Sequence, residues 1–157
     1  YLDARAHDTF HVSKLQYTDF QDVRQRGVIG MIAGEIVTTD NGYAETLFGR
    51  RRPTPELRTG NAMTRGFGER VARNTPLQGT AADIMKLAMV GVARRFKSEG
   101  IRSRITMQVH DEIVVDLVPT EREAVERIVR EQMEGAAKLS IPLVVDIGIG
   151  KNWLEAH

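Results

Sequence analysis

The sequence has 157 residues, of which 41% are apolar and 27% charged, values that are ordinary for one soluble globular domain with a sizeable core. It contains no cysteine, which excludes a disulfide framework, a cysteine-based zinc site and a thiol nucleophile. No apolar run approaches the length that a membrane-spanning helix needs, and the N-terminus lacks a signal-peptide pattern.

The formal net charge of +1 argues, taken alone, against a nucleic-acid binder, but the charge is unevenly distributed. Residues 41–104 hold 13 Lys or Arg against 5 Asp or Glu, a net charge of +8. Residues 105–157 hold 5 Lys or Arg against 10 Asp or Glu, a net charge of −5. The middle segment therefore has the charge of a polyanion-binding surface, although a solvated basic face gives the same asymmetry.

The first part of the chain gives few structural signals. Residues 28–37 fit either a buried strand or a helix weakened by two glycines, and periodicity does not decide between them. Residues 40–42, Asp-Asn-Gly, predict a turn. Residues 43–48 predict a short strand, followed by a Gly-Arg-Arg-Arg turn at 49–52.

A long helical pattern covers residues 61–97, where apolar residues recur at helical spacing. Pro76 and Gly79 interrupt this pattern, so we expect a bend or break there. Gly100 is suited to a left-handed cap that ends the helix.

The second half predicts an α+β fold. Residues 105–109 and 113–117 read as two strands of a hairpin, with His110-Asp111-Glu112 at its tip. A helix should begin at Thr120, capped by a box with Glu123, and carry an apolar stripe of Val125, Ile128, Val129 and Met133. With a last strand at 143–149, this order predicts an antiparallel sheet with helices packed on one face.

The hairpin tip is the first candidate site. Adjacent residues of a regular strand point to opposite faces, but a turn can direct both Asp111 and Glu112 toward one metal ion. Carboxylate oxygens suit Mg²⁺ or Mn²⁺, and two such ions support phosphoryl transfer. A polar, exposed turn without function is the alternative, and the same holds for His110.

The basic segment holds the second candidate site. Arg70, Asn74 and Gln78 are spaced four apart and would share one face of a helix, from which they could reach bases, sugars and phosphates. The run Arg50, Arg51 and Arg52 could bind phosphates. A solvated polar stripe and a solubilising loop are the alternatives.

Four segments of the chain carry a more specific signal: GYAETLFGRRR at 42–52, ERVARNTPLQGTAADIMKLAM at 69–89, MQVHDEIVVD at 107–116 and PLVVDIGIGKNWLEAH at 142–157. Together they resemble the family A DNA polymerases, the family of bacterial DNA polymerase I. They occur in the family's order and spacing, and they cover roughly residues 42–157. The resemblance implies a palm-type antiparallel sheet with the family's motif C hairpin, and leaves residues 1–41 as a poorly assigned N-terminal segment.

The resemblance assigns roles to the candidate residues. Asp111 matches the family's catalytic metal-binding aspartate, Glu112 its neighbouring carboxylate and His110 a histidine near the primer 3′ end. Arg70, Asn74 and Gln78 match polar residues that contact primer–template DNA, mostly in the minor groove. The implied reaction is a DNA-directed nucleotidyl transfer from deoxynucleoside triphosphates with Mg²⁺ or Mn²⁺. The implied setting is the bacterial cytoplasm, with no membrane, alongside the remaining polymerase segments.

Two family motifs are not found. The Asp-Tyr-Ser-x-x-Glu motif that carries the other catalytic aspartate has only a faint echo at 19–22, and the nucleotide-binding fingers helix has no match. We therefore expect part of a palm with an adjoining fingers-side segment, which alone does not extend a primer. A non-catalytic DNA-binding module derived from a palm, or a purely structural domain, remains an alternative.

Overall fold

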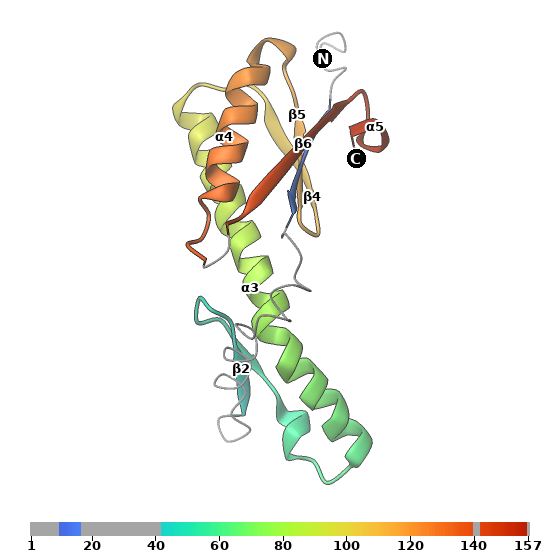
Figure 1. The fold of residues 1–157 in the computed structure, drawn as a ribbon. Coiled ribbons are helices and arrows are strands. Elements are labelled where there is room, and N and C mark those ends of the chain that lie inside the picture. The colour runs from blue at the N-terminus through green and yellow to red at the C-terminus, as the bar shows by residue number, and fades with distance from the viewer. Residues whose placement is uncertain (1–9, 17–41, 140–141, 157) are drawn as a thin grey trace, which may run out of the picture. The chain divides into compact units, whose positions relative to one another are not determined.

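The computed structural model describes residues 10–16, 42–139 and 142–156 (Figure 1). These residues fall into two compact units. The first unit contains strand β1 (Phe10–Gln16) and the described chain from Ile84 onward, and the second contains residues 42–83. The predicted boundary between residues 41 and 42 stays a prediction, because residues 17–41 lie outside the described residues. Helix α3 (Ala62–Ser98) contributes residues to both units.

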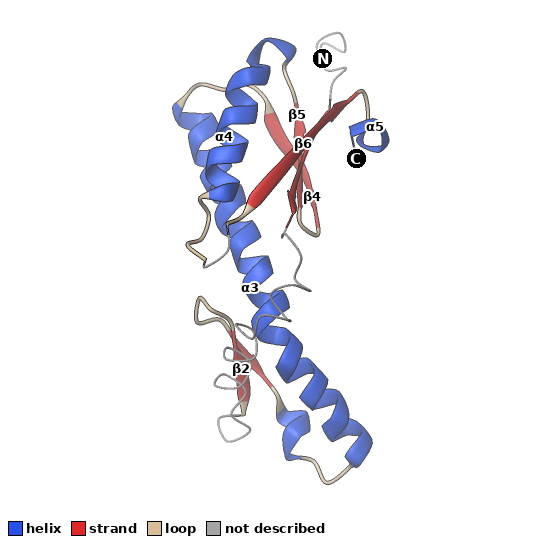
Figure 2. Cartoon of the chain, viewed as in Figure 1, coloured by secondary structure: helices blue, strands red, loops and turns tan. Residues whose placement is uncertain are grey.

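The first unit is built on a four-stranded sheet in the order β4-β5-β1-β6 (Figure 2). Every neighbouring pair is antiparallel. The remaining strands are β4 (Arg104–Val109), β5 (Glu112–Asp116) and β6 (Val144–Gly150). The predicted α+β class with an antiparallel sheet is therefore confirmed. Strand β1 was not predicted, although it lies at the centre of the sheet, where Val12 is opposite both Val114 and Gly148.

Apolar stripes from two helices form the core of the first unit. Helix α4 (Arg122–Glu134) buries its predicted stripe completely, with Val125, Ile128, Val129 and Met133 each 0% exposed. These side chains cluster with α3 residues spaced three and four apart, and with Ile113 and Val115 of the sheet. Alternation along β5 turns Val114 to the opposite face, where it contacts Ala156 of α5 (Trp153–Ala156). The long helices pack on one face of the sheet, as predicted, and the short helix α5 lies against the other.

The end of helix α3 agrees with its prediction, but its middle does not. Gly100 has a φ of +69°, and the Ile101 N–H donates to the Phe96 carbonyl at 2.9 Å, a Schellman-type end. Of the bend or break expected at Pro76, the break is wrong, because α3 is one helix from Ala62 to Ser98. Proline removes one intrahelical hydrogen bond, and the burial of Thr75 and Ala72 beside it stabilises the helix in spite of that loss.

The expected capping box at Thr120 is also wrong. Thr120 lies inside a 3₁₀ turn (Pro119–Glu121), and α4 begins only at Arg122. The Glu121 carboxylate instead accepts hydrogen bonds from the N–H and hydroxyl groups of Ser103, at 2.9 and 2.8 Å, and from the Arg102 N–H. Burial alone would raise the pKa of Glu121, but these hydrogen bonds outweigh it and lower the pKa to about 2. Glu121 therefore ties the loop before β4 to the start of α4.

The second unit contains a small hairpin and the first half of α3. Strands β2 (Tyr43–Glu45) and β3 (Arg51–Pro53) are antiparallel, with Ala44 opposite Arg52. A 3₁₀ turn (Pro55–Arg58) leads to α3, which Asn61 caps by accepting from the N–H groups of Met63 and Thr64. The predicted strand 43–48 is therefore too long. The turn is at 46–50, where the Thr46 N–H donates to the Arg50 carbonyl at 2.9 Å, and not at 49–52.

Glycine lets α3 approach its neighbours closely in the second unit. A Cβ on Gly68 would lie 2.8 Å from the Glu56 Cβ, and one on Gly79 would lie 2.5 Å from the Thr46 methyl group. The side chains packed there are small, and Ala44, Ala72 and Thr54 are all fully buried. Among the described helices, none is long and apolar enough to cross a membrane.

Candidate nucleic-acid interface and candidate metal site

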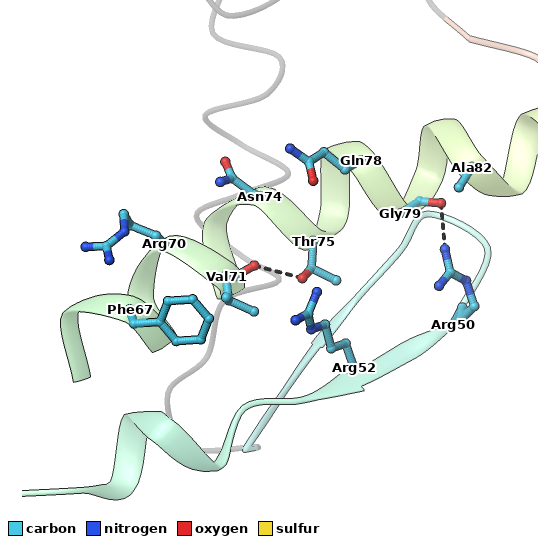
Figure 3. Close-up of a pocket in the computed structure, with 10 residues that line it drawn as sticks. All are labelled: Arg50, Arg52, Phe67, Arg70, Val71, Asn74, Thr75, Gln78, Gly79 and Ala82. Atoms are coloured by element: carbon cyan, nitrogen blue, oxygen red, sulfur yellow. Dashed lines mark hydrogen bonds between the residues drawn. The ribbon is translucent and has the colours of Figure 1, made fainter. Parts of the chain in front are cut away.

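A hollow of about 450 Å³ lies between helix α3 and the β2–β3 hairpin in the second unit (Figure 3). Its polar and aromatic lining is Arg50, Arg52, Phe67, Arg70, Asn74, Thr75 and Gln78. Successive turns of α3 carry Arg70, Asn74 and Gln78 along one side of the helix, as their spacing of four predicts. The helix continues through Pro76, so this side is not interrupted. The structure therefore brings five of the six basic-segment candidates to one place.

The three consecutive arginines have three different environments. Arg50 donates from Nε to Asp83 Oδ1 at 2.7 Å and from a terminal nitrogen to the Gly79 carbonyl at 2.9 Å. Arg51 donates from Nε to Glu45 at 2.7 Å and lies over the ring of Tyr43, and the hydrogen bond to Glu45 raises the pKa of its guanidinium. Arg51 does not line the hollow. Neighbouring residues of a strand point to opposite faces, which explains why Arg52 faces the hollow and Arg51 does not.

The hollow favours an anion flanked by hydrogen-bonding groups. Within the described ranges, neither Arg52 nor Arg70 forms an ion pair. The amide groups of Asn74 and Gln78 are exposed and can both donate and accept. Two cations beside two amides match the requirements of a nucleic-acid backbone and its groove edges.

The predicted metal site lies in the first unit, at the β4–β5 hairpin. Val109 pairs with Glu112, so the loop consists of His110 and Asp111 alone. His110 adopts a φ of +51°, and its carbonyl accepts a hydrogen bond from the Gln108 side chain at 2.6 Å. Asp111 is half-buried and His110 exposed. The loop thus presents one carboxylate and one imidazole.

Glu112 is not part of the turn, contrary to the prediction. It is the first residue of β5, it is only 4% exposed, and the Trp153 indole N–H donates to its Oε2 at 3.1 Å. A two-residue loop, one residue shorter than expected, places Glu112 in the strand. Its position in the alternation along β5 assigns it to the same face as Val114, next to α5.

Asp111 fits Mg²⁺ or Mn²⁺ as a single hard-oxygen ligand, but the donor set in the described ranges is incomplete. No group of three or more His, Asp or Glu side chains in residues 10–16, 42–139 and 142–156 is placed to hold a metal ion. The faint second-aspartate echo at 19–22 lies outside the described residues, as does the ambiguous segment 28–37. Two residues that bind candidate site residues, Asp83 and Trp153, were not predicted. Their partners Arg50 and Glu112 lie 33 and 41 residues away in the sequence, so no local pattern indicates these contacts.

Comparison with known proteins identifies the family. The sequence model of DNA polymerase family A matches residues 32–155. The chain belongs to DNA polymerase family A. The predicted resemblance is therefore confirmed, and the palm-like sheet and the hollow are features of a member of this family.

Three curated members of family A illustrate the similarity. DNA polymerase I of Caldicellulosiruptor bescii is 45% identical over 74% of this chain, and that of Pseudomonas aeruginosa is 44% identical over 90%. The thermostable DNA polymerase I of Thermus aquaticus is 50% identical over 73%. The matched part spans only 14%, 16% and 14% of these proteins.

A solved structure from family A has a similar fold. The POL domain of Pol1 from M. smegmatis, in complex with DNA primer–template and dNTP, aligns with a TM-score of 0.77 and 41% identity. The alignment covers 83% of this chain and 23% of that one.

Proposed function

We propose that this chain supplies a duplex-binding surface and one metal-binding carboxylate to a DNA-directed DNA polymerase. The reaction would be the template-directed transfer of deoxynucleotides from their triphosphates to a primer 3′ hydroxyl. The observation that carries the proposal is the hollow of the second unit, which Arg52, Arg70, Asn74 and Gln78 all line, in a chain that belongs to family A. The family A structure solved with primer–template DNA and dNTP supports the choice of partners.

The side chains around the hollow divide into two roles. Arg52 and Arg70 neutralise phosphates, a contribution that is independent of base sequence and weakens with salt. Asn74 and Gln78 contact the minor groove, where different base pairs present similar acceptors. Contacts of this kind report whether a base pair has regular geometry without reading its identity. Arg50 is held by Asp83, so it contributes to DNA binding mainly by fixing the position of the turn at 46–50.

The loop of the first unit supplies the other part of the proposal. Asp111 would hold Mg²⁺ or Mn²⁺, and such an ion stabilises the negative charge that develops on a transferred phosphoryl group. His110 lies beside it with an exposed imidazole that can donate a hydrogen bond to a primer end. Glu112 acts from inside the sheet, where its hydrogen bond with Trp153 fixes the strand that carries the loop.

Arg70→Ala tests the hollow directly, because Arg73 provides a matched control. Arg73 is an exposed arginine on the same helix that does not line the hollow. Fluorescence anisotropy of a labelled primer–template duplex, measured between 50 and 200 mM salt, should show weaker binding for Arg70→Ala and a salt slope smaller by about 1. Arg73→Ala should change the slope much less. Equal effects of the two variants would remove the hollow from the DNA interface.

A second candidate function is a DNA-binding module without catalysis. The burial of Glu112 against Trp153 favours it, because a carboxylate engaged in this way is poorly placed to share a metal ion. Calorimetric titration with Mn²⁺ in the presence of duplex separates the two proposals. A polymerase part should show a divalent-ion site that Asp111→Asn removes, whereas a binding module should give the same titration for both proteins.

A further inference from the structure

The turn of the β2–β3 hairpin is attached to helix α3 through both oxygens of one carboxylate. The Thr46 hydroxyl donates to Asp83 Oδ2 at 2.7 Å, and Arg50 Nε donates to Asp83 Oδ1 at 2.7 Å. The Asp83 side chain is only 13% exposed, so water competes little for these bonds. Asp83 itself does not line the hollow.

Further contacts fix the turn in register with the helix. Arg50 also donates to the Gly79 carbonyl at 2.9 Å, and the Leu47 N–H donates to the Thr80 hydroxyl at 2.9 Å. Inside the turn, the Arg50 N–H donates to the Thr46 hydroxyl at 3.1 Å. A Cβ on Gly79 would collide with Thr46, so the helix and the turn are in van der Waals contact. Asp83 is therefore the centre of a polar clamp, defined here as Thr46, Arg50, Gly79 and Asp83.

The polar clamp has a consequence for Arg52. Arg50 at the end of the turn and Arg52 in β3 are two residues apart, and both line the hollow. Arg50 is held by the carboxylate, whereas Arg52 forms no ion pair within the described ranges. Fixing Arg50 therefore fixes the backbone from which the guanidinium of Arg52 extends.

We propose that Asp83 is a positioning residue for DNA binding: it holds the hairpin turn on α3 so that Arg52 faces the same hollow as Arg70, Asn74 and Gln78. This inference rests on the proposed function of the hollow. Asp83 acts through Arg50 and Thr46 and does not itself contact DNA, since a carboxylate near phosphates would repel them. The residue Glu45 offers a contrast, because its ion pair with Arg51 has the same 2.7 Å length but involves an arginine that does not line the hollow.

A double-mutant cycle between Asp83→Asn and Arg52→Ala tests the inference on duplex affinity. Arg52→Ala should raise the Kd by about fivefold at 0.15 M salt, the effect of one phosphate contact. Asp83→Asn should raise it at least about twofold, and Arg52→Ala added to Asp83→Asn should then cost clearly less than it does alone. Glu45→Gln, the matched control, should leave the Kd unchanged. An unchanged Kd for Asp83→Asn, or fully additive effects of the two changes, overturns the inference.

Amide hydrogen exchange followed by NMR gives a readout that does not depend on DNA. Asp83→Asn should speed exchange of the Leu47 and Arg50 amides by at least about tenfold, because both take part in the turn, and Glu45→Gln should not. Amides that stay protected in Asp83→Asn overturn the positioning role whatever the binding result. Thr46→Val removes one clamp hydroxyl with little change in shape, and it serves as the second variant if Asp83→Asn does not fold.

The two readouts separate failure of this inference from failure of the proposed function. If Arg52→Ala and Arg70→Ala both leave duplex binding unchanged, the proposed function of the hollow is wrong, and the role of Asp83 in DNA binding falls with it. If those two variants weaken binding but Asp83→Asn does not, only the positioning role is wrong.

Discussion

The sheet that carries Asp111 is backed by large apolar side chains, whereas the hollow beside Arg70 is built over small and polar ones. The first unit buries Ile113, Ile128 and Met133 almost completely. In the second unit the buried side chains within the described ranges are alanines, threonines and Pro76, and the polar clamp attaches the hairpin to the helix. The position of Asp111 should therefore depend on packing, and that of Arg52 on hydrogen bonds and ion pairs.

The largest effect on activity should come from the His110-Asp111 loop of the first unit. With this chain placed in a complete family A polymerase, Asp111→Asn should lower single-nucleotide incorporation at least about a hundredfold, because it removes a charged ligand from the phosphoryl-transfer site. Duplex affinity, measured by anisotropy, should be unaffected. Asp146→Asn is the control, since Asp146 is an exposed aspartate of β6 outside the loop. Near-normal turnover by Asp111→Asn would show that the metal assignment is wrong.

Ile128→Ala tests whether apolar packing stabilises the first unit, which carries the His110-Asp111 loop. Ile128 is fully buried in α4 among side chains of α3 and the sheet, so the change should lower the free energy of unfolding by about 2–5 kcal/mol. Urea denaturation followed by circular dichroism measures this loss. Leu154→Ala is the comparison, because Leu154 is 86% exposed and should cost much less. Similar losses for the two variants would mean that the α4 stripe is not the core of this unit.

The parts of the fold that could be predicted are those with a local signal. The stripe from Val125 to Met133 follows from helical period alone, and the His110-Asp111 turn follows from polar residues between two apolar strands. Strand β1 could not be predicted, because its partners β5 and β6 are about a hundred or more residues away and its apolar–polar alternation extends only from Phe10 to Ser13. The continuity of α3 through Pro76 likewise depends on tertiary packing that a local pattern does not contain.

The candidate sites show the same limit at the scale of single residues. The spacing of Arg70, Asn74 and Gln78 was sufficient to place them together. The position of Glu112 was not predicted, because the β4–β5 loop is one residue shorter than expected. The position of Arg51 was not predicted, because the turn of the β2–β3 hairpin lies earlier in the chain than expected. In a strand, a shift of one residue turns a side chain to the opposite face. Charge and composition predicted a basic surface but not which arginines on it are already paired.

Replacing Glu121 should have a smaller, pH-dependent effect on the stability of the first unit. Its pKa is about 2 in the folded chain and near 4.5 when unfolded, so its stabilising contribution is complete above pH 4.5 and is lost as the pH falls toward 2. Glu121→Gln should cost about 1–3 kcal/mol at pH 6, and the difference from the native chain should shrink at pH 3. Urea midpoints at the two pH values measure it, with the exposed Glu123→Gln as control. A difference that is constant with pH would mean that the charge of Glu121 does not stabilise the fold.

The smallest effect should come from Arg51, which contrasts with its neighbour Arg52. Arg51 pairs with Glu45 and lies over Tyr43 on the surface, with 62% of its side chain exposed, and an ion pair this exposed contributes little to stability. Arg51→Ala should therefore change the urea midpoint far less than Ile128→Ala does. Its effect on the salt slope of duplex binding should be clearly smaller than that of Arg52→Ala, although both variants remove one positive charge from the same strand. Equal slopes would show that overall charge, and not the direction in which β3 presents its side chains, controls DNA binding by this hairpin.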